Sequence, residues 1–202
     1  MSEASHDKVT KGARRRAAML AAATQVFLEK AFGGATLDDV IARSGGSRAT
    51  LYEHFGDKEG LFAAIIGDLC ARMAAPFDIA QQKNPWTVLT ALGRTYMTML
   101  MTPANLALYR MVVAESRRFP RLAAEVFAAG PETLAVRLTA YLRAELRVRT
   151  ADRAARIFLE MVKGDLHTRA LFGVGPRATK KDIDTCVREA VRIFCDGLAV
   201  RS

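Results

Sequence analysis

TLDDVIARSGGSRATLYEHFGDKEGL, residues 36–61, carries the strongest structural signal in the chain. Thr36, with an aspartate three residues later, has capping-box chemistry and predicts the start of a helix. Gly45 tolerates the left-handed backbone of a tight turn, which predicts the end of that helix. Ser47 is a good N-cap for a second short helix. Two short helices joined by a glycine-containing turn predict a helix-turn-helix over about residues 36–55.

The second of these helices predicts two unlike faces. At 3.6 residues per turn, Leu51 and Phe55 share the inner face, and Ala49 and Glu53 lie on the opposite side. Small and polar residues outside, with bulky residues inside, suit a helix that enters the major groove of DNA. A solvent-facing amphipathic helix in another kind of bundle has the same spacing, so the pattern alone leaves both interpretations open.

The rest of the chain also predicts helices. Apolar residues recur at spacings of three and four, and no alternating run bounded by hairpin turns is present. Proline after a good cap residue favours a helix start, which predicts starts at Asn84-Pro85, Thr102-Pro103 and Gly130-Pro131. We therefore expect an all-α fold of nine or ten helices without a sheet.

Composition excludes several classes of protein. With 50% hydrophobic and 25% charged residues among 202, the chain can bury a core and is not of the disordered type. Its three cysteines have no metal-ligand spacing, so we expect no metal, no cofactor and a reducing cytoplasmic location. No apolar run is long enough to span a bilayer, so no membrane partner is expected. Catalytic signatures such as GxSxG and HExxH are absent, and we expect no enzyme.

The net charge of +9 says little about DNA binding until its distribution is considered. Residues 1–60 hold nine basic and eight acidic side chains, so the excess of positive charge lies later in the chain. A local basic cluster nevertheless spans residues 8–16 without an acidic residue. Two interpretations stay open: the cluster reaches DNA beside the helix-turn-helix, or it is a solvated segment.

The stretch over residues 36–61 resembles the signature of TetR-type transcriptional regulators. Gly46 departs from that signature, which usually has an aliphatic residue there, and Ala49 stands where glycine is frequent. The positions that agree are Thr36, Ala42, Gly45, Ser47, Leu51, Tyr52, His54, Phe55, Lys58, Glu59 and Leu61.

The resemblance implies a DNA-binding domain over 13–73 and a C-terminal effector-binding and dimerisation domain over 74–202. It implies a homodimer on a near-palindromic operator in double-stranded DNA, with base or phosphate contacts from one set of residues. Thr36 and Ser47 are helix caps that could also reach phosphate. The implied DNA-binding residues are Thr36, Ser47, Arg48, Ala49, Thr50, Tyr52, Glu53, His54 and Lys58.

The segment from Tyr109 to Pro120, followed by Gly130-Pro131, is similar to the AefR-like branch of that family. The resemblance implies a dimer interface formed by helices at about 151–172 and 179–199. It also implies an effector pocket, which apolar and methionine side chains with a few polar groups would line. Plain core packing remains the alternative for each of them. These candidates are Phe77, Trp86, Leu89, Tyr96, Met97, Met101, Tyr109, Met111, Glu115, Phe127 and His167.

The function that the resemblance implies is a ligand-responsive transcriptional regulator. We expect a repressor that releases its operator when it binds a small apolar molecule. The alternative is a helical protein-interaction or ligand-binding module without sequence-specific DNA binding.

Overall fold

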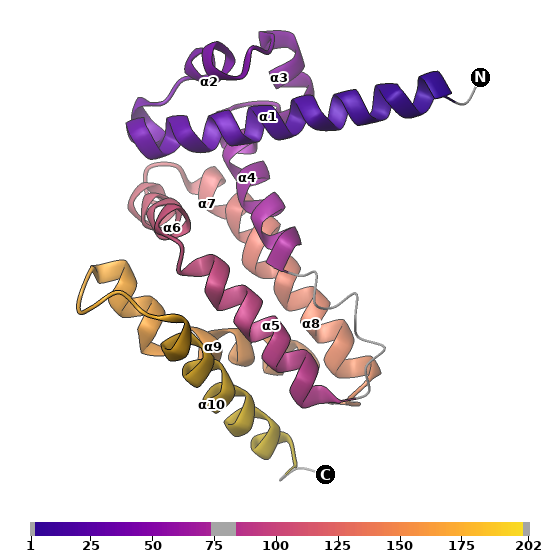
Figure 1. Cartoon of the computed structure of the whole chain (residues 1–202), viewed down its shortest axis with the longest axis vertical. Coiled ribbons are helices and arrows are strands. Elements are labelled where there is room, and N and C mark those ends of the chain that lie inside the picture. Colours follow the sequence, from indigo (N-terminus) through magenta and orange to yellow (C-terminus); the bar gives the residue numbers. More distant parts are fainter. Residues whose placement is uncertain (1–2, 74–83, 200–202) are drawn as a thin grey trace. The chain divides into compact units, whose positions relative to one another are not determined.

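The computed structural model describes residues 3–73 and 84–199, and every regular element among them is helical. The all-α prediction is thereby confirmed for the described part of the chain (Figure 1). The elements are α1 (Glu3–Gly34), α2 (Leu37–Ser44), α3 (Arg48–Phe55), α4 (Lys58–Met73), α5 (Pro85–Leu100), α6 (Pro103–Glu115), α7 (Pro120–Phe127), the π-helix η2 (Ala128–Glu132), α8 (Thr133–Ala144), α9 (Ala151–Phe172) and α10 (Lys180–Ala199).

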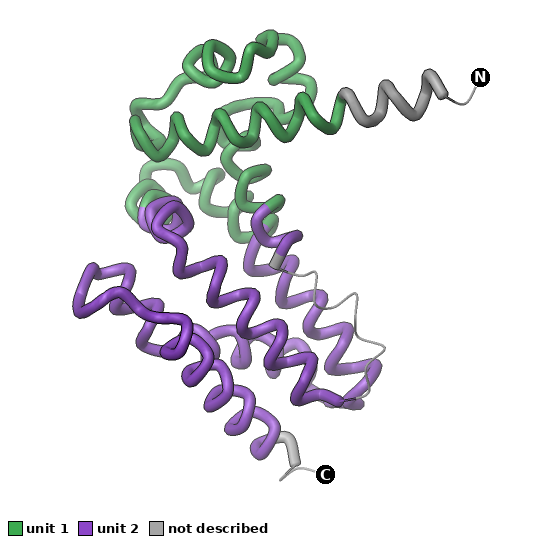
Figure 2. Tube along the Cα trace, in the orientation of Figure 1, with its two compact units in different colours: residues 1–68, 111–129 green, residues 69–110, 130–202 purple. Residues whose placement is uncertain are grey.

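The chain divides into two compact units (Figure 2). Unit 1 comprises residues 1–68 and 111–129, and unit 2 comprises residues 69–110 and 130–202. The helix-turn-helix therefore shares its unit with the end of α6 and with α7, which lie far along the chain. The predicted DNA-binding domain over 13–73 and effector-binding domain over 74–202 are defined by function, and these two ranges stay a prediction.

Aromatic side chains form the centre of unit 1. Phe27, Phe32 and Phe62 are fully buried, and the ring of Phe32 lies 5.7 Å from that of Phe27 and 5.6 Å from that of Phe62. Phe119, which directly precedes α7, meets Phe32 edge-on, with the two ring centres 5.0 Å apart. Edge-on aromatic pairs add to the stability that burial of their area gives. This cluster therefore ties α1, α4 and the start of α7 together.

The helix-turn-helix forms as its local chemistry predicts. The Thr36 hydroxyl accepts from the amide of Asp39, and the Asp39 carboxylate accepts from the amide of Thr36, so the capping box is present. Gly45 ends α2 with φ 69°, and the Ser47 hydroxyl accepts from the amide of Thr50 at the start of α3. Leu51, on the inner face of α3, is fully buried. Each of these contacts is local, which explains why sequence alone could predict them.

Gly46, the departure from the family pattern, has a packing reason. A Cβ at this position would lie only 2.4 Å from the methyl carbon of Met19. Met19 is fully buried, so its side chain occupies the space that an aliphatic residue at position 46 would need. Gly46 and Met19 therefore complement each other in volume.

Unit 2 is built chiefly from α5, α8, α9 and α10. Gly93 on α5 lets the helices approach, because a Cβ there would lie 2.8 Å from Val187 on α10 and 3.5 Å from Val162 on α9. Val162 and Val187 are both fully buried. At the edge of the unit, Arg156 on α9 makes two 2.8 Å hydrogen bonds to the carboxylate of Glu132.

Of the three helix starts predicted at prolines, two are confirmed and one is wrong. Pro85 and Pro103 are the first residues of α5 and α6. Gly130-Pro131 instead lies inside η2, and α8 begins only at Thr133. A π-helical turn is wider than an α-turn, and such bulges occur where the regular hydrogen-bond ladder is interrupted. Proline has no amide hydrogen, so it interrupts that ladder inside a helix, whereas at a helix start its missing amide has no partner within the helix in any case.

Gly93→Ala is expected to destabilise the protein by about 1–3 kcal/mol, because the added methyl group overpacks a filled core. Thermal unfolding followed by circular dichroism measures the effect. Gly67→Ala on α4 is the matched control, since its Cβ would meet Ala129 at an ordinary 3.5 Å. This control is expected to be neutral or stabilising. Equal stability of the two variants would contradict the packing described for Gly93.

Candidate nucleic-acid interface

The outer face of α3 is open to solvent. Arg48, Ala49, Glu53 and His54 are exposed, and Tyr52 is 48% exposed. Thr50 is half-buried beside Ser47. A helix whose outer face combines a guanidinium, a methyl group and a carboxylate has the groups that read guanine, thymine and cytosine edges in the major groove.

Arg48 is held by an exposed ion pair. Its guanidinium lies 2.5 Å from the carboxylate of Asp38 on α2, and both side chains are more than 60% exposed. Asp38 raises the pKa of Arg48, chiefly through this hydrogen bond. Exposed pairs contribute at most about 1 kcal/mol, so the guanidinium can exchange Asp38 for a base edge at little cost.

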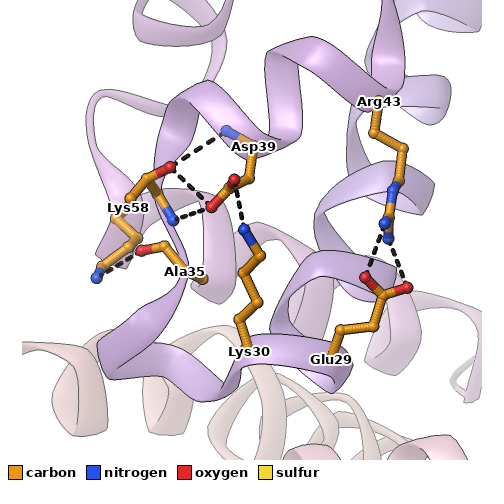
Figure 3. A network of polar contacts seen from close by, with 7 residues as sticks. Glu29, Lys30, Ala35, Asp39, Arg43 and Lys58 are labelled. Carbon is orange, nitrogen blue, oxygen red and sulfur yellow. Dashed lines mark hydrogen bonds and ion pairs between the residues drawn. The ribbon is translucent and has the colours of Figure 1, made fainter.

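Figure 3 shows a second set of polar contacts, which joins α1 to α2. Arg43 makes a two-pronged pair with Glu29, with distances of 2.8 and 2.7 Å. Lys30 lies 2.6 Å from Asp39, whose pKa falls to about 2 because of hydrogen bonds from Lys30 and Thr36. Thr36 is thus engaged as a cap within this network, although it remains exposed.

Lys58 is directed toward the protein itself. Its ammonium donates to the backbone carbonyl oxygens of Phe32 at 2.9 Å and Ala35 at 3.1 Å (Figure 3 draws the Ala35 contact). It also lies 4.6 Å from the centre of the Phe32 ring. Cations near a helix C-terminus satisfy carbonyl groups that have no partner within the helix. The predicted phosphate contact of Lys58 stays a prediction, and it would require Lys58 to leave these carbonyls.

Lys58→Met is expected to lower the free energy of unfolding by about 1.5–3 kcal/mol, since hydrogen bonds to a charged group are lost. Lys30→Met is the matched control, because its ion pair is exposed and is worth at most about 1 kcal/mol. Chemical denaturation of the two variants measures the difference. If Lys58→Met left stability unchanged but flattened the salt dependence of DNA binding, Lys58 would be a phosphate contact and not a structural cap.

The predicted effector residues are divided between the two units. In unit 1, Met111 and Glu115 are half-buried, and Phe127 is 55% exposed. Phe77 lies outside the described residues. The remaining candidates belong to unit 2, where Leu89, Tyr96, Met97 and His167 are buried, Met101 and Tyr109 are half-buried, and Trp86 is 40% exposed.

His167 stands out among these candidates. It is 3% exposed, and its Nε2 atom has no hydrogen-bond partner among the described residues. The ring of Tyr109 meets it edge-on at 5.0 Å. The pKa of His167 falls to about 4, chiefly because of burial and also because of the nearby charge of Lys163, which Glu160 opposes. The imidazole is therefore neutral at pH 7.

Unit 2 also has an open groove of about 590 Å³ that sequence reasoning did not predict. Of the predicted effector residues that the structure describes, Met101 alone lines this groove, together with Leu106, Arg110, Leu166 and the loop over 173–178. Arg110 donates to the carbonyl oxygens of Ala170 and Leu171 at the end of α9. No local pattern in the sequence marks such a contact, because its partners are about 60 residues apart.

Among residues 3–73 and 84–199, no helix is long and apolar enough to cross a membrane. Within the same residues, no three or more His, Cys, Asp or Glu side chains gather in a way that could hold a metal ion.

These elements define a helix-turn-helix protein with a second unit, whose described regular elements are all helices. Residues 19–65 match the family model of the tetR family of bacterial regulatory proteins. Residues 87–197, more than half of the chain, match the C-terminal domain of AefR-like transcriptional repressors. The chain therefore belongs to the TetR family, with an AefR-like C-terminal part, and the predicted resemblance is confirmed.

Known relatives agree with this assignment. The transcriptional repressor AcnR of Corynebacterium glutamicum is 40% identical over 74 residues, which are 37% of this chain and 38% of AcnR. The chain thus matches well under half of that curated relative. A TetR-family regulator from Mesorhizobium loti has a TM-score of 0.77 at 21% identity, over 92% of this chain and 97% of its own. The flavonoid-responsive regulator FrrA has a TM-score of 0.65 at 27% identity, with the same coverage.

Proposed function

We propose that the protein is a transcriptional repressor that reads a near-palindromic operator with α3. The exposed polar face of α3 over two buried side chains, Leu51 and Phe55, carries this proposal. Arg48, Ala49, Thr50 and Glu53 would contact base edges, while Tyr52 and His54 would contact phosphate. Thr36 and Ser47, the N-caps of α2 and α3, would add phosphate contacts at the starts of these helices. The name of AcnR supports repression, and the proposal includes a cytoplasmic location and no catalytic role.

The proposed dimer forms through α9 and α10. Ile157 on α9 and Ile193 on α10 are 46% and 49% exposed, and Phe172 at the end of α9 is 79% exposed. Exposed large apolar side chains on neighbouring helices favour contact with another protein surface. A symmetric dimer holds two recognition helices a fixed distance apart, as two half-sites on DNA require.

The proposed effector is a small, largely apolar molecule bound in the C-terminal domain. Tyr96, Tyr109 and the neutral His167 would supply polar groups among apolar surroundings. The name of FrrA, flavonoid-responsive regulator, supports neutral aromatic molecules as the first to test. An effector that favours a protomer shape with the wrong spacing of recognition helices lowers operator affinity by its differential affinity for the two shapes.

Fluorescence anisotropy on the DNA directly upstream of the protein's own gene tests the proposal. We expect tighter binding to this duplex than to a scrambled duplex of the same composition. Arg48→Ala is expected to cost about 1–3 kcal/mol on the specific duplex and to relax preference at one base position in each half-site. Its folding should be unaffected, since only the exposed pair with Asp38 is lost. Equal affinity of the wild type for both duplexes, repeated with every upstream fragment, would contradict the proposal.

A further inference from the structure

The helix-turn-helix carries few cations for a surface that binds a polyanion. Residues 17–60, which contain α2 and α3, hold four Lys or Arg side chains against six Asp or Glu side chains. The affinity of DNA-binding proteins rests largely on cations that neutralise phosphates and release counterions. This segment alone is therefore electrostatically unfavourable for an approach to DNA.

All four of these cations are also engaged within the protein. Lys30 pairs with Asp39, Arg43 with Glu29, and Arg48 with Asp38, while Lys58 binds two backbone carbonyl oxygens. A cation that leaves such a partner for a phosphate gains only the difference between the two interactions. The phosphate-binding charge of the DNA-binding unit must come mainly from elsewhere in the chain.

Residues 8–16, the basic arm, hold five Lys or Arg side chains and no acidic one. They belong to α1, and among the side chains of α1 that the structure describes, from residue 12 onward, the first buried ones are Met19 and Leu20. Arg14 and Arg15 are exposed, and neither has an ion pair with another described residue. The side chains of Lys8 and Lys11 lie outside the described residues.

The C-terminal end of the basic arm, at Arg16, lies next to α3, the helix proposed to read bases. The guanidinium of Arg16 is 5.4 Å from the centre of the Phe55 ring, and Phe55 is the last residue of α3. A guanidinium over the face of an aromatic ring is attracted to the ring, so this contact favours the position of Arg16 beside α3. α1 rises about 1.5 Å per residue from there toward its N-terminus, so the basic arm extends away from a point fixed on α3.

We propose that the basic arm is a second DNA contact, which binds the phosphate backbone of the duplex beside the base pairs that α3 reads. This inference rests on the proposed function, because it presupposes that α3 engages duplex DNA. The arm supplies charge that the helix-turn-helix lacks, and it is indifferent to base sequence. Base preference and phosphate affinity are thereby divided between α3 and the basic arm.

The test compares the double variant Arg14→Gln/Arg15→Gln with Arg143→Gln/Arg149→Gln, which removes the same charge from exposed positions of unit 2. Anisotropy is recorded from 50 to 200 mM NaCl on the specific duplex and on its scrambled counterpart. The arm variant is expected to bind both duplexes more weakly by the same factor. For each phosphate contact that the arm variant loses, the factor by which affinity falls between 50 and 200 mM NaCl is expected to be about threefold smaller than in the wild type. The control should behave as wild type, and circular dichroism verifies the helix content of both variants.

An unchanged salt slope in the arm variant, or an equal change in the control, would overturn the proposal. A loss confined to the specific duplex would overturn it as well, because the arm would then read bases. Failure of the proposed function gives a different result, since wild type would then bind both duplexes equally whatever the arm variant does.

Discussion

Phe32→Ala is expected to lower the free energy of unfolding by about 3–5 kcal/mol. The variant is therefore expected to unfold, and to lose DNA binding, at a lower temperature than the wild type. Phe32 is fully buried, and its ring contacts Phe27, Phe62 and Phe119. Truncation removes the transfer free energy of the ring and leaves a cavity that its neighbours fill only in part. It also removes the aromatic face beneath the ammonium of Lys58. The effect is measured by thermal unfolding of the full chain.

Phe127→Ala is the matched control for this prediction. The same atoms are removed, but Phe127 is 55% exposed, so the expected cost is far smaller. A similar loss of stability in the two variants would mean that the aromatic cluster does not hold unit 1 together. A stable Phe32→Ala protein that binds DNA normally would contradict the account of the fold around α2 and α3.

Acidification is expected to destabilise the protein between pH 6.5 and about pH 4 because His167 is buried in its neutral form. Its pKa falls from 6.5 to about 4 in the folded protein, so the unfolded chain binds more protons within this window. The stability that depends on neutral His167 is therefore fully present above pH 6.5 and is lost as the pH falls toward 4. The loss between pH 7.5 and pH 5 is about 2 kcal/mol, which chemical denaturation at both pH values can measure.

His167→Gln tests the assignment of this pH dependence. The amide does not titrate, so the difference between its stabilities at pH 7.5 and pH 5 should shrink by most of that amount. Asp39 contributes little between pH 7.5 and pH 5, because its carboxyl is ionised there both in the folded protein, where its pKa is about 2, and in the unfolded chain, where its pKa is 3.8. An undiminished pH dependence in the variant would show that His167 is not the group responsible.

Sequence reasoning succeeded where the chemistry is local. The capping box of Thr36 and Asp39, the left-handed Gly45 and the cap at Ser47 involve residues at most four apart, and all are present. Such features depend on backbone geometry that neighbouring residues fix among themselves. The same reasoning misplaced Gly130-Pro131, because a proline inside a π-helical turn follows the same residue pattern as one at a helix start.

Contacts between distant residues could not be predicted in this way. Nothing near Lys58 indicates that its ammonium reaches the carbonyl of Phe32, 26 residues earlier. Nothing near Phe119 indicates that its ring joins a cluster on α1 and α4. Tertiary packing sets both contacts. The first of them gives Lys58 carbonyl partners at the end of α1, while the phosphate contact that the family resemblance implies for Lys58 stays a prediction.

Selection from a library of random duplexes tests the central claim, that α3 reads base edges in two symmetric copies, most directly. The purified protein is expected to enrich a near-palindrome whose half-site centres lie about 10 base pairs, or a multiple of that, apart. Arg48→Ala should lose the preference at one position in each half-site and keep the rest. Sequences that remain random after repeated rounds, while the protein still binds every duplex with the same salt-sensitive affinity, would contradict the claim.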